Sequence, residues 1–108
     1  MQLIESIVRP DKVDAVKDAL VALGASGMTV TEVRGHGLQK GRSTVYRGKE
    51  YRVSLLPKAK VECVVADHLV EPAVAAVMKA ARTGEAGDGR ISVTPVLQTY
   101  RIRTGERE

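Results

Sequence analysis

The stretch KAKVECVVADHLVEPAVAAVMKAARTG, residues 58–84, changes its hydrophobic period once. Up to Val65, apolar and polar residues alternate, which is typical of a strand with one buried face. From Val70 onward, apolar residues recur at helical spacing, and Pro72 fits only the first turn of such a helix. Gly84 follows the predicted helix end. The stretch therefore predicts a strand that is followed directly by a helix.

The N-terminal part of the chain predicts the same succession. We expect a strand from Leu3 to Arg9, because Pro10 ends it. A helix follows, with apolar residues at helical spacing: Val13, Val16, Leu20 and Leu23. Gly24 suits the position after the helix end. The segment from Met28 to Arg34 is rich in β-branched residues and predicts a second strand.

Two further strands are expected beyond residue 84. Ile91 and Val93 mark a short fourth strand, and Leu97 to Arg103 a fifth. The whole order is β-α-β, a long polar segment from Gly35 to Leu56, β-α-β and a tail strand. This order predicts an α+β fold of the ferredoxin-like βαββαβ type with an antiparallel sheet. A loop as long as the polar segment is usually functional or disordered in a compact domain.

The composition fits one small domain without large aromatic side chains. The 108 residues include no phenylalanine or tryptophan and only three tyrosines, so the core must consist of aliphatic side chains. Such a core buries little area per chain, which favours oligomerisation. The single cysteine fits a reducing cytoplasm, and Cys63 alternates with Val61 and Val65 as a buried strand residue does. No apolar run has the length of a membrane span, and the first five residues do not read as a signal peptide.

The positive charge is concentrated in the long polar segment. Between Gly37 and Pro57 there are five basic residues and one acidic residue, a difference that equals the net charge of +4 of the whole chain. An even basic coat would have indicated nucleic acid or anionic lipid as a partner. One basic loop on an otherwise nearly neutral chain indicates a specific docking element instead.

The glycine-rich segment TGEAGDGR, residues 83–90, indicates a ligand site. Its three glycines allow positive φ angles and a close approach of backbone N–H groups to an anion. Arg101 and Arg103 are two residues apart, so on an extended strand their guanidinium groups would leave from one face. Either feature alone also fits a flexible turn or a solvated strand end. Together they favour a phosphate ligand, most simply a nucleotide.

Other chemistries have less support in the sequence. The glycine segment is not a P-loop, because Arg90 closes it and no hydroxyl residue follows directly, and it lacks the Gly-x-Gly-x-x-Gly order of dinucleotide-binding folds. An enzymatic role lacks a catalytic base, since the only histidines, His36 and His68, form no pair suited to a metal or a nucleophile. RNA binding lacks base-stacking aromatic residues on the first and third strands.

Six segments together resemble the PII signal-transduction family, the nitrogen regulatory proteins P-II. They occur in the family's order and spacing and extend over essentially the whole chain: Gly27–Val33, Gln39–Gly41, Tyr46–Tyr51, Leu56–Lys58, Ala81–Gly84 with Gly87–Gly89, and Arg101–Glu106. The resemblance implies one domain, residues 1–108, with the ferredoxin-like fold. It also implies a homotrimer whose nucleotide sites lie between neighbouring subunits. The matching parts are a T-loop at 37–55, a nucleotide-binding loop at 82–90, and a C-terminal strand and tail at 97–108.

By this resemblance, ATP or ADP is the effector. The residues that match the family's nucleotide-binding positions are Thr29, Gly35, His36, Gly37, Val64, Gly87, Asp88, Gly89, Arg90, Arg101 and Arg103. Among them, Arg101 and Arg103 match phosphate-binding arginines that come from the adjacent subunit. A second ligand, 2-oxoglutarate, binds in the family together with Mg-ATP. The residues that match its site are Gln39, which also serves as a ligand of magnesium, Lys40, Gly41 and Lys58.

The T-loop residues match positions that contact protein partners. Tyr51 matches a tyrosine that some members have modified by a uridylyl-transferring enzyme. The residues that match partner-binding positions are Tyr46, Arg47, Gly48, Lys49 and Glu50, with Arg47 in the place of the arginine that plugs an ammonium channel. The resemblance therefore implies a cytoplasmic, non-enzymatic regulator of a membrane transporter, above all an ammonium channel, or of a metabolic enzyme. A transporter would recruit it to the membrane, and nucleic acid is not a partner.

The base of the T-loop departs from the family pattern. The family's Gly-Phe-Gly-Arg-Gln-Lys-Gly reads Gly-His-Gly-Leu-Gln-Lys-Gly at residues 35–41. Leu38 removes a cation beside the phosphates, and His36 places a titratable ring where an aromatic hydrocarbon is usual. Two functions stay open: a sensor of adenylates and 2-oxoglutarate, and a divergent member that binds ATP or ADP alone and regulates a transporter other than an ammonium channel. A small nucleotide-dependent enzyme is a remote alternative.

Overall fold

The computed structural model describes residues 1–25, 27–36, 43–46, 49–52 and 55–108, with side chains left out at 43–46 and 49–52. Its elements, in chain order, are β1 (Gln2–Val8), η1 (Pro10–Lys12), α1 (Val13–Ala22), β2 (Thr29–Gly35), β3 (Ser43–Tyr46), β4 (Lys49–Arg52), β5 (Leu56–Val65), η2 (Asp67–Leu69), α2 (Val70–Ala81) and β6 (Arg90–Pro95). The strands and helices predicted up to Val93 are therefore confirmed, with ends that shift by one or two residues.

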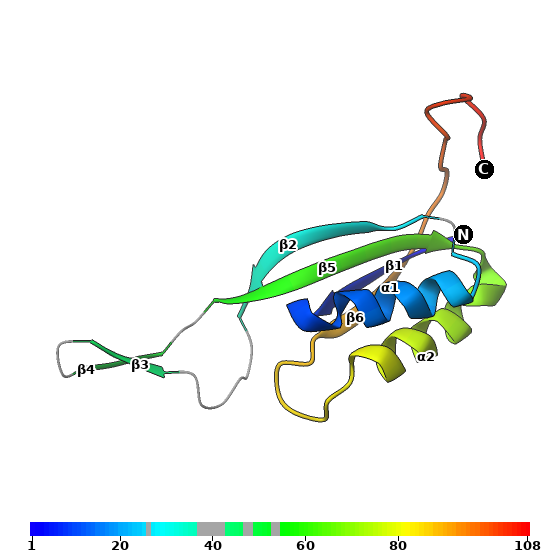
Figure 1. Cartoon of the computed structure of the whole chain (residues 1–108). Helices are drawn as coiled ribbons and strands as arrows, with labels where there is room; N and C mark the ends of the chain where they lie inside the picture. Colours follow the sequence, from blue (N-terminus) through cyan, green and yellow to red (C-terminus); the bar gives the residue numbers. More distant parts are fainter. Residues whose placement is uncertain (26, 37–42, 47–48, 53–54) are drawn as a thin grey trace.

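Four strands form the main sheet in the order β2-β5-β1-β6, and every neighbouring pair is antiparallel. Each half of the chain contributes a β-α-β unit whose two strands are separated by a strand of the other half. Both helices lie against the same face of this sheet (Figure 1). This arrangement confirms the α+β ferredoxin-like fold.

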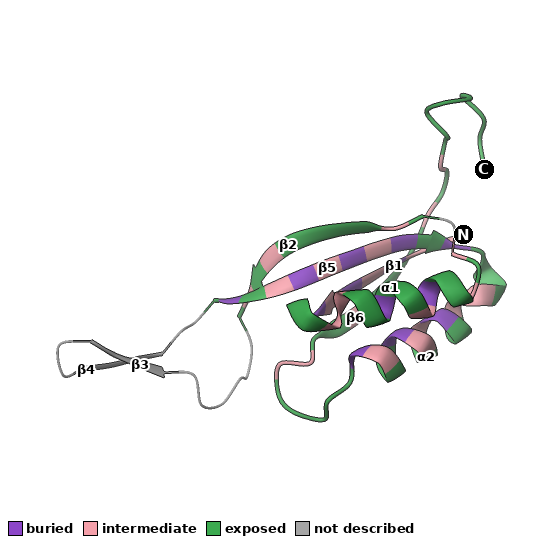
Figure 2. Cartoon of the chain, viewed as in Figure 1, coloured by how far each residue is buried: buried purple, intermediate pink, exposed green. Residues whose placement is uncertain are grey.

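The core lies between the sheet and the two helices, and it is aliphatic. The buried residues that form it are Ile4, Val8, Val16, Leu20, Ala59, Val61, Cys63, Val65, Ala73, Val77 and Ala81. Burial alternates along β1 and β5, because successive side chains of a strand point to opposite faces. Figure 2 shows the same alternation along β5. Cys63 is buried as predicted, and this burial raises the pKa of its thiol.

The helix ends follow from local chemistry. After α1, Gly24 has a φ of 89°, and its N–H donates to the carbonyl of Val21 over 2.9 Å. After α2, Gly84 has a φ of 90°, a conformation that glycine adopts without the steric cost of a Cβ. Pro72 is the third residue of α2, where no helical hydrogen bond from its nitrogen is needed. Neither helix of the described part of the chain is long and apolar enough to cross a membrane.

The long polar segment contains secondary structure that the sequence did not predict. β3 and β4 pair antiparallel as a separate two-stranded sheet, with Tyr46 opposite Lys49. The physical reason is local, because the two strands contain β-branched and aromatic residues such as Val45 and Tyr51, which favour extended backbone. Each strand has only four residues, too few for an alternation of apolar and polar residues to indicate it in the sequence.

The predicted fifth strand, Leu97 to Arg103, is wrong. The tail leaves the sheet after Pro95 and forms a turn whose arms meet in an isolated β-bridge between Tyr100 and Arg107 (Figure 1). Gly105 supports the turn with a φ of 73°. A strand needs a neighbour for its N–H and C=O groups, and among the described residues the backbone bonds of 97–108 run within the tail itself. The C-terminal segment 97–108 is therefore a tail with a turn.

Candidate functional site

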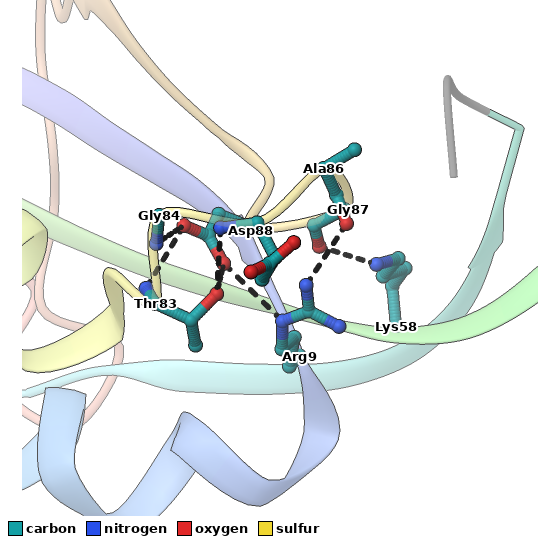
Figure 3. Close-up of polar contacts among 8 residues, drawn as sticks. Arg9, Lys58, Thr83, Gly84, Ala86, Gly87 and Asp88 are labelled. Atoms are coloured by element: carbon teal, nitrogen blue, oxygen red, sulfur yellow. Dashed lines mark hydrogen bonds and ion pairs between the residues drawn. The ribbon is translucent and has the colours of Figure 1, made fainter. Parts of the chain in front are cut away.

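The loop of residues 83–89 is organised around the carboxylate of Asp88. One carboxylate oxygen accepts hydrogen bonds from the backbone N–H groups of Thr83 and Gly84, over 2.9 and 2.8 Å. The other oxygen accepts from the Thr83 hydroxyl and from Nε of Arg9, the latter over 3.2 Å. Four donors thus converge on one side chain. Although Asp88 matches a nucleotide-binding position, its carboxylate here points into the loop (Figure 3).

Two cations hold the carbonyl groups of the same loop. Arg9 donates from Nη2 to the carbonyl of Ala86 over 2.9 Å, and Lys58 donates from Nζ to the carbonyl of Gly87 over 2.6 Å (Figure 3). The C=O and the following N–H of a trans peptide point in opposite directions. The two bonds therefore direct the N–H groups of Gly87 and Asp88 away from these cations. Successive N–H groups that point to one side can bind an anion.

Gly89 lets the loop rest directly on strand β1. Its φ is 106°, and a Cβ at this position would lie 1.6 Å from the carbonyl oxygen of Ile7. No other residue fits without a shift of the backbone, because the obstacle is itself main chain. Arg90 then begins β6 opposite Ile7. Glycine at position 89 therefore fixes the distance between the loop and the sheet.

The hydrogen bonds at Asp88 lower the pKa of its carboxyl well below the ordinary range. The bond from the Thr83 hydroxyl is the largest cause, and the backbone N–H groups of Thr83 and Gly84 and the Arg9 guanidinium act in the same direction. Asp88 is therefore a fixed anion at neutral pH, and its charge balances Arg9.

Further predicted site residues lie at the same end of the sheet as this loop, which we call the loop end. Gly35 is the last residue of β2, and a Cβ on it would lie 3.3 Å from Cγ of Lys58. His36 follows Gly35 directly and is exposed. Because Lys58 also contacts Gly87, the structure brings together the end of β2, the predicted 2-oxoglutarate lysine and the glycine loop.

The remaining described site residues lie at the opposite end of the sheet, which we call the tail end. Thr29 begins β2 opposite Glu62, and Val64 lies near the end of β5. The tail leaves from the same end, since Val96 donates its N–H to the carbonyl of Met1. From Lys58 to Val64 the strand spans roughly 20 Å at about 3.3 Å per residue. The predicted nucleotide residues of one chain therefore form two separate groups.

The two predicted phosphate-binding arginines do not share a strand face. Residues 102–104 form the turn of the tail, with Arg103 exposed within it. Arg101 precedes the turn, and its guanidinium donates to Oε1 of Glu108 from Nε and Nη2, over 2.9 and 2.6 Å. The expectation that both guanidinium groups leave one extended face was wrong, because the backbone turns between the two residues.

Several predicted residues lie outside the described part of the chain: Gly37, Gln39, Lys40, Gly41, Arg47 and Gly48. Others lie in β3 and β4, where only the backbone is described: Tyr46, Lys49, Glu50 and Tyr51. Their roles stay predictions. Among the described residues, no group of three or more histidine, cysteine, aspartate or glutamate side chains could hold a metal ion.

Arg9 and Thr83 both bond to Asp88, and neither is among the individual site residues predicted from the sequence. Arg9 ends the first predicted strand next to Pro10, a place that indicates a strand end and no role for the side chain. A signal was nevertheless present in the spacing of Thr83 and Asp88, because they flank the four residues from Gly84 to Gly87. Threonine and aspartate commonly bond to nearby backbone N–H groups in turns. Nothing local in the sequence indicates that Arg9 reaches the same carboxylate from 79 residues away.

We predict that Gly89→Ala destabilises the protein by about 3 kcal/mol or more, because strain at positive φ adds to an overlap with backbone. Gly84→Ala is the matched control. Gly84 also has positive φ, at 90°, but a Cβ there meets nothing within 4 Å. We expect it to cost about 1–2 kcal/mol. Urea unfolding at equal protein concentration measures both variants, and equal losses would contradict the direct support of the loop by β1.

We also predict that Asp88→Asn destabilises the protein at pH 7 and that the difference from wild type narrows below about pH 4. The folded-state pKa of Asp88 is lowered, so its contribution is present above the unfolded pKa and disappears as the pH falls toward the folded value. Urea unfolding midpoints at pH 7 and pH 3 test this. Asp18→Asn, on the exposed side of α1, is the control for removal of one acidic charge. A difference between wild type and Asp88→Asn that stays constant with pH would contradict the assignment.

Comparison with known proteins identifies the family of the chain. The model of the family described as nitrogen regulatory protein P-II matches residues 1–106. The chain is 54% identical over 107 residues to a nitrogen regulatory protein P-II of Azospirillum brasilense, covering 99% of this chain and 96% of that protein. It is 56% identical over 107 residues to that of Microchaete diplosiphon, with the same coverage. With Klebsiella oxytoca, 49% identity extends over 108 residues, all of this chain and 96% of the relative. The chain therefore belongs to the nitrogen regulatory protein P-II family of signal-transduction proteins.

Proposed function

We propose that this protein is a homotrimer that binds ATP or ADP between neighbouring subunits and transmits the nucleotide state through its T-loop. With Mg-ATP it also binds 2-oxoglutarate. It acts as a binding protein in the cytoplasm and regulates a membrane transporter, with an ammonium channel as the first candidate, or a metabolic enzyme. The observation that carries this proposal is the separation of the two groups of nucleotide residues.

The loop end supplies what the phosphate part of a nucleotide needs. The N–H groups of Gly87 and Asp88 point away from Arg9 and Lys58, which bind the preceding carbonyl groups. Arg90 follows as the first residue of β6 and is exposed. Backbone N–H groups beside an arginine suit an anion with several oxygens, since charge-assisted hydrogen bonds are the strong ones. The tail end would add Arg101 and Arg103 from another subunit.

One chain cannot bring its two ends together around one nucleotide, because roughly 20 Å of sheet lies between them. Two different ends that join in a head-to-tail contact form a closed ring if the rotation closes. Three subunits would then give three equivalent sites. Exposed apolar residues of the tail favour such a contact, since Leu97 is 93% and Ile102 99% exposed in the single chain.

The 2-oxoglutarate site would lie between the T-loop and the glycine loop. Lys58 is half-buried, and its ammonium group already reaches the loop. A carboxylate of 2-oxoglutarate that bound this ammonium group would alter its hydrogen bond to the Gly87 carbonyl. The binding of 2-oxoglutarate and of the nucleotide would thereby be coupled. Any such coupling is reciprocal between nucleotide and 2-oxoglutarate. Gln39 would complete the coordination of magnesium through its amide oxygen.

The T-loop is the docking element of this proposal. Its five basic residues would meet an acidic or channel-like surface, with Tyr46, Arg47, Gly48, Lys49 and Glu50 as the contact residues and Tyr51 as the position for uridylyl modification. The charge of this loop is the main electrostatic feature of the chain. Electrostatic complementarity sets specificity and association rate more than affinity.

A second function within the family is favoured by one feature of the sequence. Leu38 stands where relatives usually carry arginine, so the T-loop base offers one cation fewer to a triphosphate and a dianion. A member that binds ATP or ADP without 2-oxoglutarate, and that regulates a transporter other than an ammonium channel, would fit this change.

We predict that Arg90→Ala and Arg103→Ala each weaken ATP and ADP binding by about 1.5–3 kcal/mol, because each removes a charge-assisted contact to phosphate. The two variants should complement each other. In a head-to-tail ring, every mixed trimer contains one junction between an intact loop end and an intact tail end. Co-expression with two tags, purification on both, and titration calorimetry should recover about one tight site per mixed trimer.

The homogeneous variants serve as controls for this experiment, since neither contains an intact junction. If the mixed trimers bind no better than either parent, both arginines act within one chain or not at all, and the proposal fails. Wild-type affinities weaker than millimolar for ATP and for ADP would also refute it.

We further predict that 2-oxoglutarate binds only in the presence of Mg-ATP and that Lys58→Met abolishes this binding. ADP affinity should change less, because Arg9 and Asp88 still hold the glycine loop. Lys60→Met is the matched control: Lys60 lies on the same strand face, 3.4 Å from a carboxylate oxygen of Glu62. Calorimetry with both ligands measures the effect. Tight 2-oxoglutarate binding without nucleotide would contradict the mechanism, whereas its absence under every condition would favour the second function.

A further inference from the structure

The C-terminal tail is closed by its own hydrogen bonds. The N–H of Arg101 donates to the carbonyl of Glu106 over 2.8 Å, and the N–H of Gly105 donates to the carbonyl of Arg101 over 2.7 Å. At its end, the N–H of Glu108 donates to the carbonyl of Thr99 over 2.9 Å. These bonds fold the last residues back onto the residues that precede the turn. The side chain of Glu108 is thereby held beside that of Arg101.

The contact between these two side chains uses the part of the guanidinium that binds oxyanions. Nε and Nη2 of Arg101 both donate to Oε1 of Glu108. Nε and one terminal nitrogen form the edge with which arginine commonly binds a carboxylate or a phosphate. Both side chains remain about half exposed, at 52% and 45%. The carboxylate is therefore well placed and still open to exchange with a solution anion.

We propose that Glu108 is an internal competitor for the nucleotide: its carboxylate occupies Arg101 in the free protein and must leave before Arg101 can bind phosphate. This proposal rests on the function proposed above and adds a regulatory element to the same site. One guanidinium edge cannot serve the carboxylate and a phosphate at once. We call the contact between Arg101 and Glu108 the tail latch.

The tail latch should lower nucleotide affinity modestly. An exposed ion pair contributes little, so its release would cost a ligand about two- to fivefold in affinity. The contact is electrostatic and exposed, so salt should weaken it. Within the proposed ring the tail latch also affects where the guanidinium of Arg101 lies. The turn that closes the latch holds it beside Glu108 of the same chain. A phosphate on the neighbouring loop end would compete with Glu108 for the same group.

The matched variants are Glu108→Gln and Glu106→Gln. Each removes one negative charge from the tail, and Glu106 is likewise exposed. The backbone carbonyl with which Glu106 accepts from Arg101 is unchanged in its variant. Only Glu108→Gln removes the carboxylate that contacts the guanidinium. A general charge effect would act equally in both variants, whereas the tail latch distinguishes them.

Titration calorimetry with ATP and with inorganic tripolyphosphate at about 20 mM salt tests the proposal. Glu108→Gln should bind both anions about two- to fivefold more tightly than wild type, and Glu106→Gln should change affinity less. The gain should shrink at about 500 mM salt. In the Arg101→Ala background, Glu108→Gln should have no further effect, because the two residues act as a pair.

A second measurement reports on the contact without any ligand. The Nε–H resonance of Arg101 in a nitrogen–proton correlation spectrum should move in Glu108→Gln and stay in place in Glu106→Gln. An unmoved resonance in both variants would overturn the tail latch. Wild-type nucleotide binding that Glu108→Gln leaves unchanged would overturn the latch and leave the proposed function standing. Failure of wild type and both variants to bind ATP would overturn the proposed function and the tail latch with it.

Discussion

The antiparallel pairing of β1 with both β5 and β6 is the constraint that joins the core to the candidate site. Its register places Ile4 opposite Cys63 on one side and Val93 on the other. The same register sets Ile7 opposite Arg90, with the Ile7 carbonyl directly beneath Gly89. A shift of this register by one residue would turn the buried side chains of β1 to the open face of the sheet. It would also move the Ile7 carbonyl away from Gly89. Packing energy thus specifies the geometry of a loop that itself contributes little to the core.

The same sheet also favours the proposed sharing of a nucleotide site between subunits. Both helices cover one face, so the opposite face, the strand ends and the tail remain available for contacts with other molecules (Figure 2). The chain carries Lys58 and the glycine loop at one end and Thr29, Val64 and the tail at the other. Two unlike ends on one sheet favour a head-to-tail ring, because the loop end and the tail end can contact each other only when they belong to neighbouring subunits. An aliphatic core of limited size adds an energetic reason to associate.

The fold was predictable because its signals are local and repeated. The alternation over residues 58–65, the helical spacing that follows, and glycines such as Gly84 each predict their element independently. The place of the glycine loop between α2 and β6 was also predictable, and its role as a ligand site stays a prediction. Its internal bonding was not predictable, because the bond from Arg9 to Asp88 joins residues 79 positions apart. The predicted tail strand failed for a related reason: alternation describes what a segment could do, and only the rest of the structure decides whether a neighbouring strand is present.

Two carboxylates, Asp88 and Glu108, hold arginines in this structure, and the difference between their surroundings separates a structural contact from an exchangeable one. Asp88 accepts from four donors, three of them on Thr83 and Gly84, and its side chain is 25% exposed. A ligand that displaced Arg9 would leave the other donors in place. Within the described part of the chain, the side chain of Glu108 accepts from one guanidinium, and it is 45% exposed. An incoming anion could take the place of this carboxylate on the Arg101 guanidinium and leave Glu108 hydrated. The count of donors and the access of water therefore make the Asp88 contact part of the scaffold and the Glu108 contact a competitor.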